Sequence, residues 1–115
     1  MYVQDDLGIY VMQIASIMTG MHPQTLRKYE RAGLISPSRR NTIRLYSDED
    51  IARLKMIKHL VEDKGLNLSG VHLFLQIREK LIKLKEIMPS YGMSKEIEER
   101  LTGTIDEILE MLGGA

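Results

Sequence analysis

Residues 22–46 read HPQTLRKYERAGLISPSRRNTIRLY, and the breaks within this stretch predict a short helix followed by a small ribbon. Pro23 suits the first turn of a helix, because the N–H that proline lacks has no partner at that position. Gly33 can adopt the positive φ that ends a helix, so the helix is expected to run to about Arg31. Leu26 and Tyr29 lie three residues apart and are expected to face a neighbouring helix.

That neighbour is expected at residues 12–19, where Val11, Ile14, Ala15 and Met18 fall on one side of a helix. Gly20 then makes a tight break before Pro23. Two short helices joined by a tight glycine-containing turn are typical of a helix-turn-helix.

The ribbon is predicted between residues 36 and 47. Pro37 does not continue a helix, and Ile43 and Leu45 alternate with Arg44 and Tyr46 at the period of a β-strand. The tip is expected at residues 39–41. We therefore predict a basic two-stranded wing beside the helix-turn-helix.

Three further helices are expected downstream. Ser47 is a suitable N-cap, with Asp50 as its capping-box partner, for a helix that ends at residues 64–65. The next helix is expected at about 68–88 and the last at about 94–112, separated by Pro89 and Gly92. The predicted fold class is mainly α: a winged helix-turn-helix with a β-ribbon wing and C-terminal dimerisation or regulatory helices. The expected domains are residues 1–88 and a short C-terminal helix at 89–115.

The last two helices carry apolar rows at the spacing of a coiled coil. These rows, which we call the seam, comprise Phe74, Ile77, Leu81, Leu84 and Met88 in the first helix and Leu101, Ile105, Ile108 and Leu112 in the second. A chain of this size has one core to fill, so the seam requires a further partner. Two alternatives remain open: the last helix folds back within the chain, or the seams pair across a homodimer.

Composition excludes several classes of protein. The 115 residues are 43% hydrophobic and 28% charged, which is typical of one globular domain. No apolar run approaches the ~20 residues that cross a bilayer, and no secretory signal is evident, so a cytoplasmic location (nucleoid-associated when bound to DNA) is expected. The absence of cysteine excludes disulfides and thiolate chemistry. His22, His59 and His72 lack ligand-like spacing, so we predict no enzyme activity, no cofactor and no metal site.

The net charge of zero conceals a strong segregation of charge. Residues 22–46 contain six basic side chains and one acidic side chain, a net charge of +5, whereas residues 86–115 carry −5. On the second helix the polar face is formed by Gln24, Thr25, Arg27, Lys28 and Arg31. An α-helix fits the major groove, where Arg and Lys read guanine and Gln reads adenine, while Arg39, Arg40 and Arg44 could reach the flanking backbone or the minor groove. An ordinary solvated cationic face is the less favoured alternative.

The chain from about Tyr10 to Leu75 closely resembles the DNA-binding domain of MerR-type transcription regulators. The matching positions are Thr25-Leu26-Arg27, Tyr29-Glu30, Gly33-Leu34, Pro37, Arg39, Arg44, Tyr46-Ser47, Asp50-Ile51, Leu54, Gly65, Leu68 and Val71. Within this superfamily, residues 20–27 (GMHPQTLR) are most similar to the HspR-like heat-shock repressors. Lys28 departs from the tyrosine of many members, and the wing tip lacks the usual glycines.

The resemblance implies a homodimeric repressor of chaperone genes that binds an inverted repeat in double-stranded DNA, with an Hsp70-type chaperone as co-repressor. The implied DNA contacts are His22, Gln24, Thr25, Arg27, Lys28 and Tyr29 on the helix and Arg39, Arg40, Asn41, Arg44 and Tyr46 on the wing. Leu26, Leu34, Ile51 and Leu54 are implied core residues. A similar nitrogen-metabolism repressor controlled by a protein partner is one alternative, and a helical adaptor that does not bind DNA is another.

Overall fold

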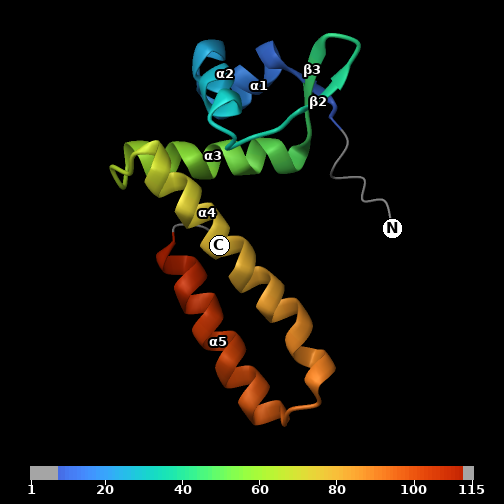
Figure 1. The fold of residues 1–115 in the computed structure, drawn as a ribbon, viewed down its shortest axis with the longest axis vertical. Coiled ribbons are helices and arrows are strands. Elements are labelled where there is room, and N and C mark those ends of the chain that lie inside the picture. The colour runs from blue at the N-terminus through green and yellow to red at the C-terminus, as the bar shows by residue number, and fades with distance from the viewer. Residues whose placement is uncertain (1–7, 113–115) are drawn as a thin grey trace. The chain divides into compact units, whose positions relative to one another are not determined.

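The computed structural model describes residues 8–112. It contains the elements β1 (Tyr10–Val11), α1 (Met12–Thr19), α2 (Pro23–Arg31), β2 (Ser38–Arg40), β3 (Ile43–Tyr46), α3 (Asp48–Glu62), α4 (Leu68–Ile87), the 3-10 helix η2 (Met88–Tyr91) and α5 (Lys95–Met111) (Figure 1). The predicted mainly helical winged fold is therefore confirmed. Two compact units divide between His59 and Leu60, within α3. The domain boundary expected after residue 88 stays a prediction.

The first unit, residues 8–59 of the described chain, has an apolar core under a small antiparallel sheet of strand order β1-β3-β2. Ala15 of α1, Leu26 of α2, Tyr46 of β3 and Leu54 of α3 are each 0% exposed. The sheet corrects one expectation, because the ribbon has a third strand. Tyr10 and Val11 pair with Tyr46 and Leu45, and a strand of two residues is too short to produce a periodic pattern.

The face of α1 also differs from the expectation. Ala15 and Thr19 are buried, whereas Val11, Ile14 and Met18 are 41%, 43% and 37% exposed. Of the four side chains expected on one side of this helix, only Ala15 is therefore buried in the core of this unit.

The start of α3 forms the capping box that the sequence predicted. The Asp50 N–H donates to Ser47 Oγ at 3.0 Å, and the Ser47 N–H donates to Asp50 Oδ2 at 2.9 Å. Two N–H groups that lack helical partners are thereby satisfied. The helix then contributes Ile51, Leu54 and Ile57 to the core at intervals of three residues.

The second unit, residues 60–112 of the described chain, is a helical hairpin in which α5 folds back on α4 (Figure 1). Asn67 Oδ1 accepts from the Gly70 N–H at 2.8 Å at the start of α4, and Ser94 Oγ accepts from the Ile97 N–H at 3.3 Å at the start of α5. The reversal uses η2, which includes Pro89, and Gly92 at φ 65°. The fold-back alternative for the last helix is therefore present within a single chain.

Candidate nucleic-acid interface

The turn between α1 and α2 is held by several backbone and side-chain contacts. Gly20 adopts a φ of 69° and its N–H donates to Ser16 O, while the Ser16 hydroxyl donates to Met21 O. Lys58 Nζ, from α3, lies 3.4 Å from both Thr19 O and Gly20 O at the carboxyl end of α1. A cation at this end is favourable because helix dipoles leave partial negative charge there. These contacts stabilise the turn that connects the two helices.

The helix α2 presents one buried and one polar face. Leu26 and Tyr29 are 0% and 6% exposed, and they anchor the helix in the core. Gln24, Arg27, Lys28 and Arg31 are exposed and Thr25 is half-buried. The polar face that the sequence predicted therefore points to solvent on a helix whose rotation is set by packing.

His22 has a structural role that sequence reasoning missed. Its Nδ1 accepts the Gln24 N–H at 3.0 Å, so the imidazole is the N-cap of α2. The signal available in the sequence was its position immediately before Pro23, which is where an N-cap residue is expected. The ring remains exposed, so a cap and an outward contact are both open to it.

The wing turns at Asn41 and Thr42, one residue later than the predicted tip. Arg39 pairs with Arg44 and Arg40 with Ile43, which leaves a two-residue loop with Asn41 at φ 61°. Asparagine tolerates the left-handed conformation better than most residues, so it replaces the glycine that such turns otherwise require. Arg40, Asn41 and Thr42 are all exposed.

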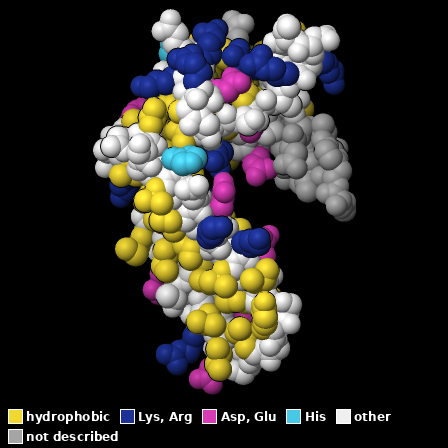
Figure 2. Space-filling view, viewed as in Figure 1, with side chains coloured by type: hydrophobic (Ala, Val, Ile, Leu, Met, Phe, Trp, Pro, Cys, Tyr) yellow, Lys and Arg dark blue, Asp and Glu magenta, His cyan; other side chains and the backbone are white. Residues whose placement is uncertain are grey.

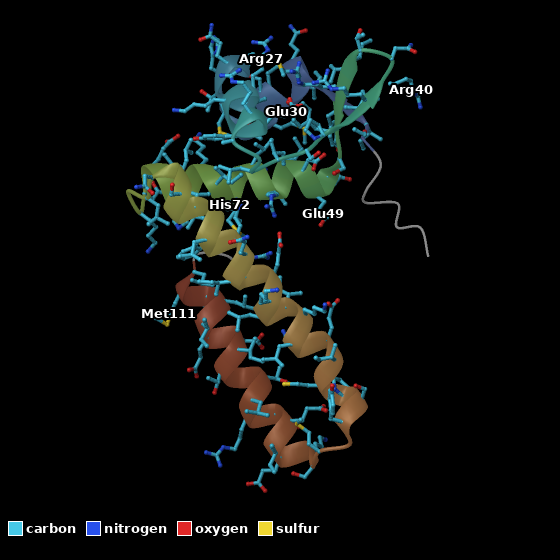
Figure 3. The ribbon with its side chains drawn as sticks, in the orientation of Figure 1. Arg27, Glu30, Arg40, Glu49, His72 and Met111 are labelled. Carbon is cyan, nitrogen blue, oxygen red and sulfur yellow. The ribbon has the colours of Figure 1, made fainter. Side chains whose placement is uncertain are left out.

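Two of the predicted wing contacts are engaged within the protein. Glu30 of α2 accepts from Arg44 Nε at 2.5 Å through one carboxylate oxygen and from Arg39 Nη2 at 3.1 Å through the other. Partial burial of Glu30 acts to raise its pKa, but the hydrogen bonds and charges of Arg44 and Arg39 outweigh burial, so the pKa lies below its ordinary value. Figure 3 shows Glu30 between α2 and the wing, whereas Arg40 lies on the opposite side of the wing.

Two predicted DNA contacts are corrected by burial. Tyr46 is 0% exposed and Tyr29 is 6% exposed, so both side chains belong to the core instead of the outer surface. Burial raises the pKa of the Tyr46 phenol, and the Glu30 carboxylate acts in the same direction. The spacing of Leu26 and Tyr29 had predicted that Tyr29 packs inward, whereas the resemblance implied a DNA contact for both tyrosines. A tyrosine in a basic motif suits either a core or a nucleic-acid contact.

The exposed basic side chains gather at the end of this unit formed by α2 and the wing (Figure 2). In the part of the chain that the structure describes, no ion pair involves Arg27, Lys28, Arg31 or Arg40. We call these four residues the basic face. Among residues 8–112 no cluster of three potential metal ligands is found, and no helix has the length and apolar character needed to span a bilayer.

The seam is divided between internal packing and solvent. Met88 and Ile105 are buried; Phe74, Leu81, Ile108 and Leu112 are half-buried; and Ile77, Leu84 and Leu101 are 42%, 45% and 43% exposed. An apolar groove of about 300 Å³ lies between the helices, lined in part by Leu84, Met88, Leu101 and Ile105. Lys85 Nζ and Asp106 Oδ1, 2.6 Å apart, join α4 to α5 beside it.

Comparison with known proteins places these features in a family. Residues 10–77 match the MerR HTH family of regulatory proteins. The chain is 38% identical over 82 residues to the "Putative heat shock protein HspR" of Streptomyces coelicolor, a match that covers 70% of this chain and 54% of that protein. It is 33% identical over 82 residues to the HTH-type transcriptional regulator GlnR of Bacillus anthracis, covering 68% and 63% of the two chains. The matches thus span between about half and two thirds of the relatives' lengths.

A solved structure supports the fold. The transcription regulator PbrR691 from Ralstonia metallidurans, determined in complex with lead(II), superposes with a TM-score of 0.57 over 90% of this chain and 73% of that one, at 18% identity. The relatives are regulators and not enzymes, which confirms the sequence-based prediction. The chain belongs to the MerR HTH family of regulatory proteins.

Proposed function

We propose that this protein is a transcriptional repressor that binds an inverted repeat in double-stranded DNA as a homodimer. The observation that carries the proposal is the basic face: Arg27, Lys28 and Arg31 are exposed on a helix that buried Leu26 and Tyr29 hold in position. Cations that lack a carboxylate partner bind phosphates and release counterions, and a rigid helix can place side chains against base edges.

The proposed contacts are His22, Gln24, Thr25, Arg27 and Lys28 on α2 and Arg39, Arg40, Asn41 and Arg44 at the wing. Arg39 and Arg44 are engaged with Glu30 in the free protein, so their contribution is expected to be smaller than that of Arg40. In a two-fold dimer the two α2 helices would enter major grooves about 34–36 Å apart or a multiple of that distance. Occlusion of the promoter would then cause repression.

The experiment starts from duplexes selected by the purified protein from a random library, followed by DNase footprinting of the enriched sequence. We expect an inverted repeat to be enriched and protected. An adaptor that does not bind DNA would enrich no sequence and protect nothing. Arg27→Ala should weaken binding, and if Arg27 contacts a phosphate, the slope of log affinity against log salt should fall by about one. Lys95→Ala is the matched control, since Lys95 is an 89% exposed cation on α5.

Repression of heat-shock genes with an Hsp70-type chaperone as co-repressor is the specific function that we favour. It is supported by residues 20–27 and by the 38% identity to the Streptomyces coelicolor relative. Addition of the chaperone from the same organism should increase affinity for the selected duplex. Control of nitrogen metabolism is the second candidate, supported by the 33% identity to GlnR. Capture of glutamine synthetase instead of the chaperone in a pull-down would favour that candidate.

A further inference from the structure

The wing places two like charges directly opposite each other. Arg39 on β2 and Arg44 on β3 are cross-strand partners, so their side chains leave the ribbon on the same side. Like charges at directly opposed positions destabilise a strand pair. A counter-ion on that side therefore stabilises the ribbon.

Glu30 supplies the counter-ion from a different element. Its two oxygens bind one arginine each, at 2.5 Å for Arg44 Nε and 3.1 Å for Arg39 Nη2. Arg39 also reaches the turn, where its Nη1 lies 3.4 Å from Thr42 O. One carboxylate of α2 thus connects to both strands of the wing and, through Arg39, to its tip. We call Glu30, Arg39 and Arg44 the wing clamp.

The clamp has a cost for DNA binding. Glu30 is the only acidic residue between His22 and Tyr46. A carboxylate on a surface that binds a polyanion lowers affinity, and it occupies two arginines that could otherwise bind phosphates. Its side chain is 22% exposed, so the negative charge is not hidden in the interior. Because Glu30 lowers the affinity for DNA, its position is better explained by its effect on the placement of the wing relative to α2.

We propose that Glu30 is a positioning residue that fixes the wing relative to α2 and thereby increases the sequence selectivity of DNA binding at the expense of general affinity. The inference rests on the proposed function, because it concerns how the same surface reads DNA. Base contacts discriminate between sequences only where rigid elements hold the contacting groups in register. Phosphate contacts tolerate displacement far better, because the backbone repeats along the duplex.

The test compares Glu30→Gln and Glu30→Asp with the wild-type protein on two probes: the duplex selected by the wild-type protein and a random-sequence duplex of equal length. Gln removes the charge and both ion pairs. Asp keeps the charge but is one carbon shorter, so it cannot reach both arginines. Glu62→Gln is the control, since it removes a charge from an exposed residue at the end of α3.

For Glu30→Gln we expect about threefold tighter binding to the random duplex, because one repulsive charge is lost. The ratio of selected to random affinity should fall roughly tenfold, the penalty of a poorly placed base contact. For Glu30→Asp the random affinity should stay near that of the wild type while the ratio falls nearly as far. A charge effect alone predicts instead that Asp behaves as wild type and that Gln raises both affinities equally, and this result would overturn the proposal.

A spectroscopic readout separates positioning from folding. The Arg44 Nε–H resonance in ¹⁵N-correlated NMR spectra should shift in both Glu30 variants, while amide signals of the α1, α2 and α3 core stay in place. Loss of dispersed signals with equal weakening on both probes would show a merely structural residue and reject the proposal. Failure of the wild-type protein to enrich any sequence would reject the proposed function itself, whereas an enriched sequence with an unchanged ratio in both variants rejects only the role of Glu30.

Discussion

Leu54 in α3 and Leu101 in α5 are the same side chain in helices of 15 and 17 residues, yet Leu54 is 0% exposed and Leu101 is 43% exposed. The difference extends to the units that contain them. Among the described residues, ten hydrophobic side chains are buried in residues 8–59 and five in residues 60–112. The two segments are almost equal in length, so the contrast lies in how each uses its apolar residues.

We propose that the two regions differ because the first positions DNA-binding groups and the second supplies a contact surface. In the winged unit, buried side chains, a capping box and the wing clamp hold the basic face in one geometry. In the hairpin, apolar side chains such as Ile77, Ile97 and Leu101 remain exposed. Figure 2 shows apolar side chains on the surface of the hairpin. Exposed apolar surface is typical of protein–protein contact sites, and we propose that the hairpin provides the contact of the proposed homodimer. In this proposal the winged unit holds DNA-binding groups in place and the hairpin mediates association.

Truncation of the two leucines should give the largest contrast. Leu54→Ala should lower the free energy of unfolding by about 2–5 kcal/mol, because it removes buried methyl groups and leaves a cavity. Leu101→Ala should lower it by less than about 1 kcal/mol, since much of that side chain is already in water. Urea unfolding followed by circular dichroism, at low protein concentration to limit association, measures both. Equal losses would contradict the proposed division between core and contact surface.

A charge on the exposed seam should alter association without altering the winged unit. Leu101→Lys should weaken the proposed homodimer by about tenfold or more, because it inserts a cation into apolar surface. Glu110→Gln makes the same change of net charge on the opposite side of α5 and is the control. Sedimentation equilibrium measures the dissociation constant. Identical constants for the two variants would exclude this part of the seam from the dimer.

Removal of helix caps compares the two units through a smaller change in the free energy of unfolding. Ser47→Ala should cost about 1 kcal/mol of unfolding free energy, because Ser47 is 2% exposed and its cap on α3 is reciprocated by Asp50. Ser94→Ala should cost a few tenths of a kcal/mol, since the Ser94 cap of α5 is longer, at 3.3 Å, and exposed. Thermal unfolding of both variants compares them. A larger loss of unfolding free energy for Ser94→Ala than for Ser47→Ala would contradict our inference that the winged unit is held more firmly than the hairpin.

Acidification should remove the contribution of the wing clamp to the free energy of unfolding, and this is the smallest effect that we expect. The pKa of Glu30 is lowered in the folded state, so its stabilising contribution is present above the ordinary pKa of 4.5 and is lost as pH falls through the folded-state pKa. The free energy of unfolding of the wild type should exceed that of Glu30→Gln by up to about 1 kcal/mol at pH 7. The two values should become equal near about pH 3. Urea unfolding at both pH values measures the difference. A difference that does not depend on pH would show that the carboxylate charge is not involved.

Local signals in the sequence predicted most of the fold. The bounds of α1 and α2 follow from Gly20, Pro23 and Gly33, and the start of α3 from Ser47, because helix ends depend on residues a few positions apart. The strand β1 was missed because two residues carry no period. The conformation of Asn41 was missed because the expected glycines are absent.

The candidate site was predicted less completely than the fold. Arg27, Lys28 and Arg40 are exposed as expected, since side chains on a polar helical face or a ribbon tip reach solvent without help from distant residues. Tyr29 and Tyr46, which the resemblance implied as DNA contacts, are buried, although helical spacing had already predicted a packed position for Tyr29. The capping role of His22 was not foreseen. For an amphipathic aromatic side chain, composition leaves the choice between core and surface open.

Residue types and short spacings along the chain already determine three of its properties. These are the order of the helices, the segregation of basic from acidic residues and the family resemblance. The pairing of Glu30 with Arg39 and Arg44 is of another kind, because residues 9 and 14 positions away meet there through the packing of α2 against the wing. Read along the sequence, Glu30 only reduces a positive charge. In three dimensions it joins two elements, because the position of a charge in space, and not its count, decides which groups it holds.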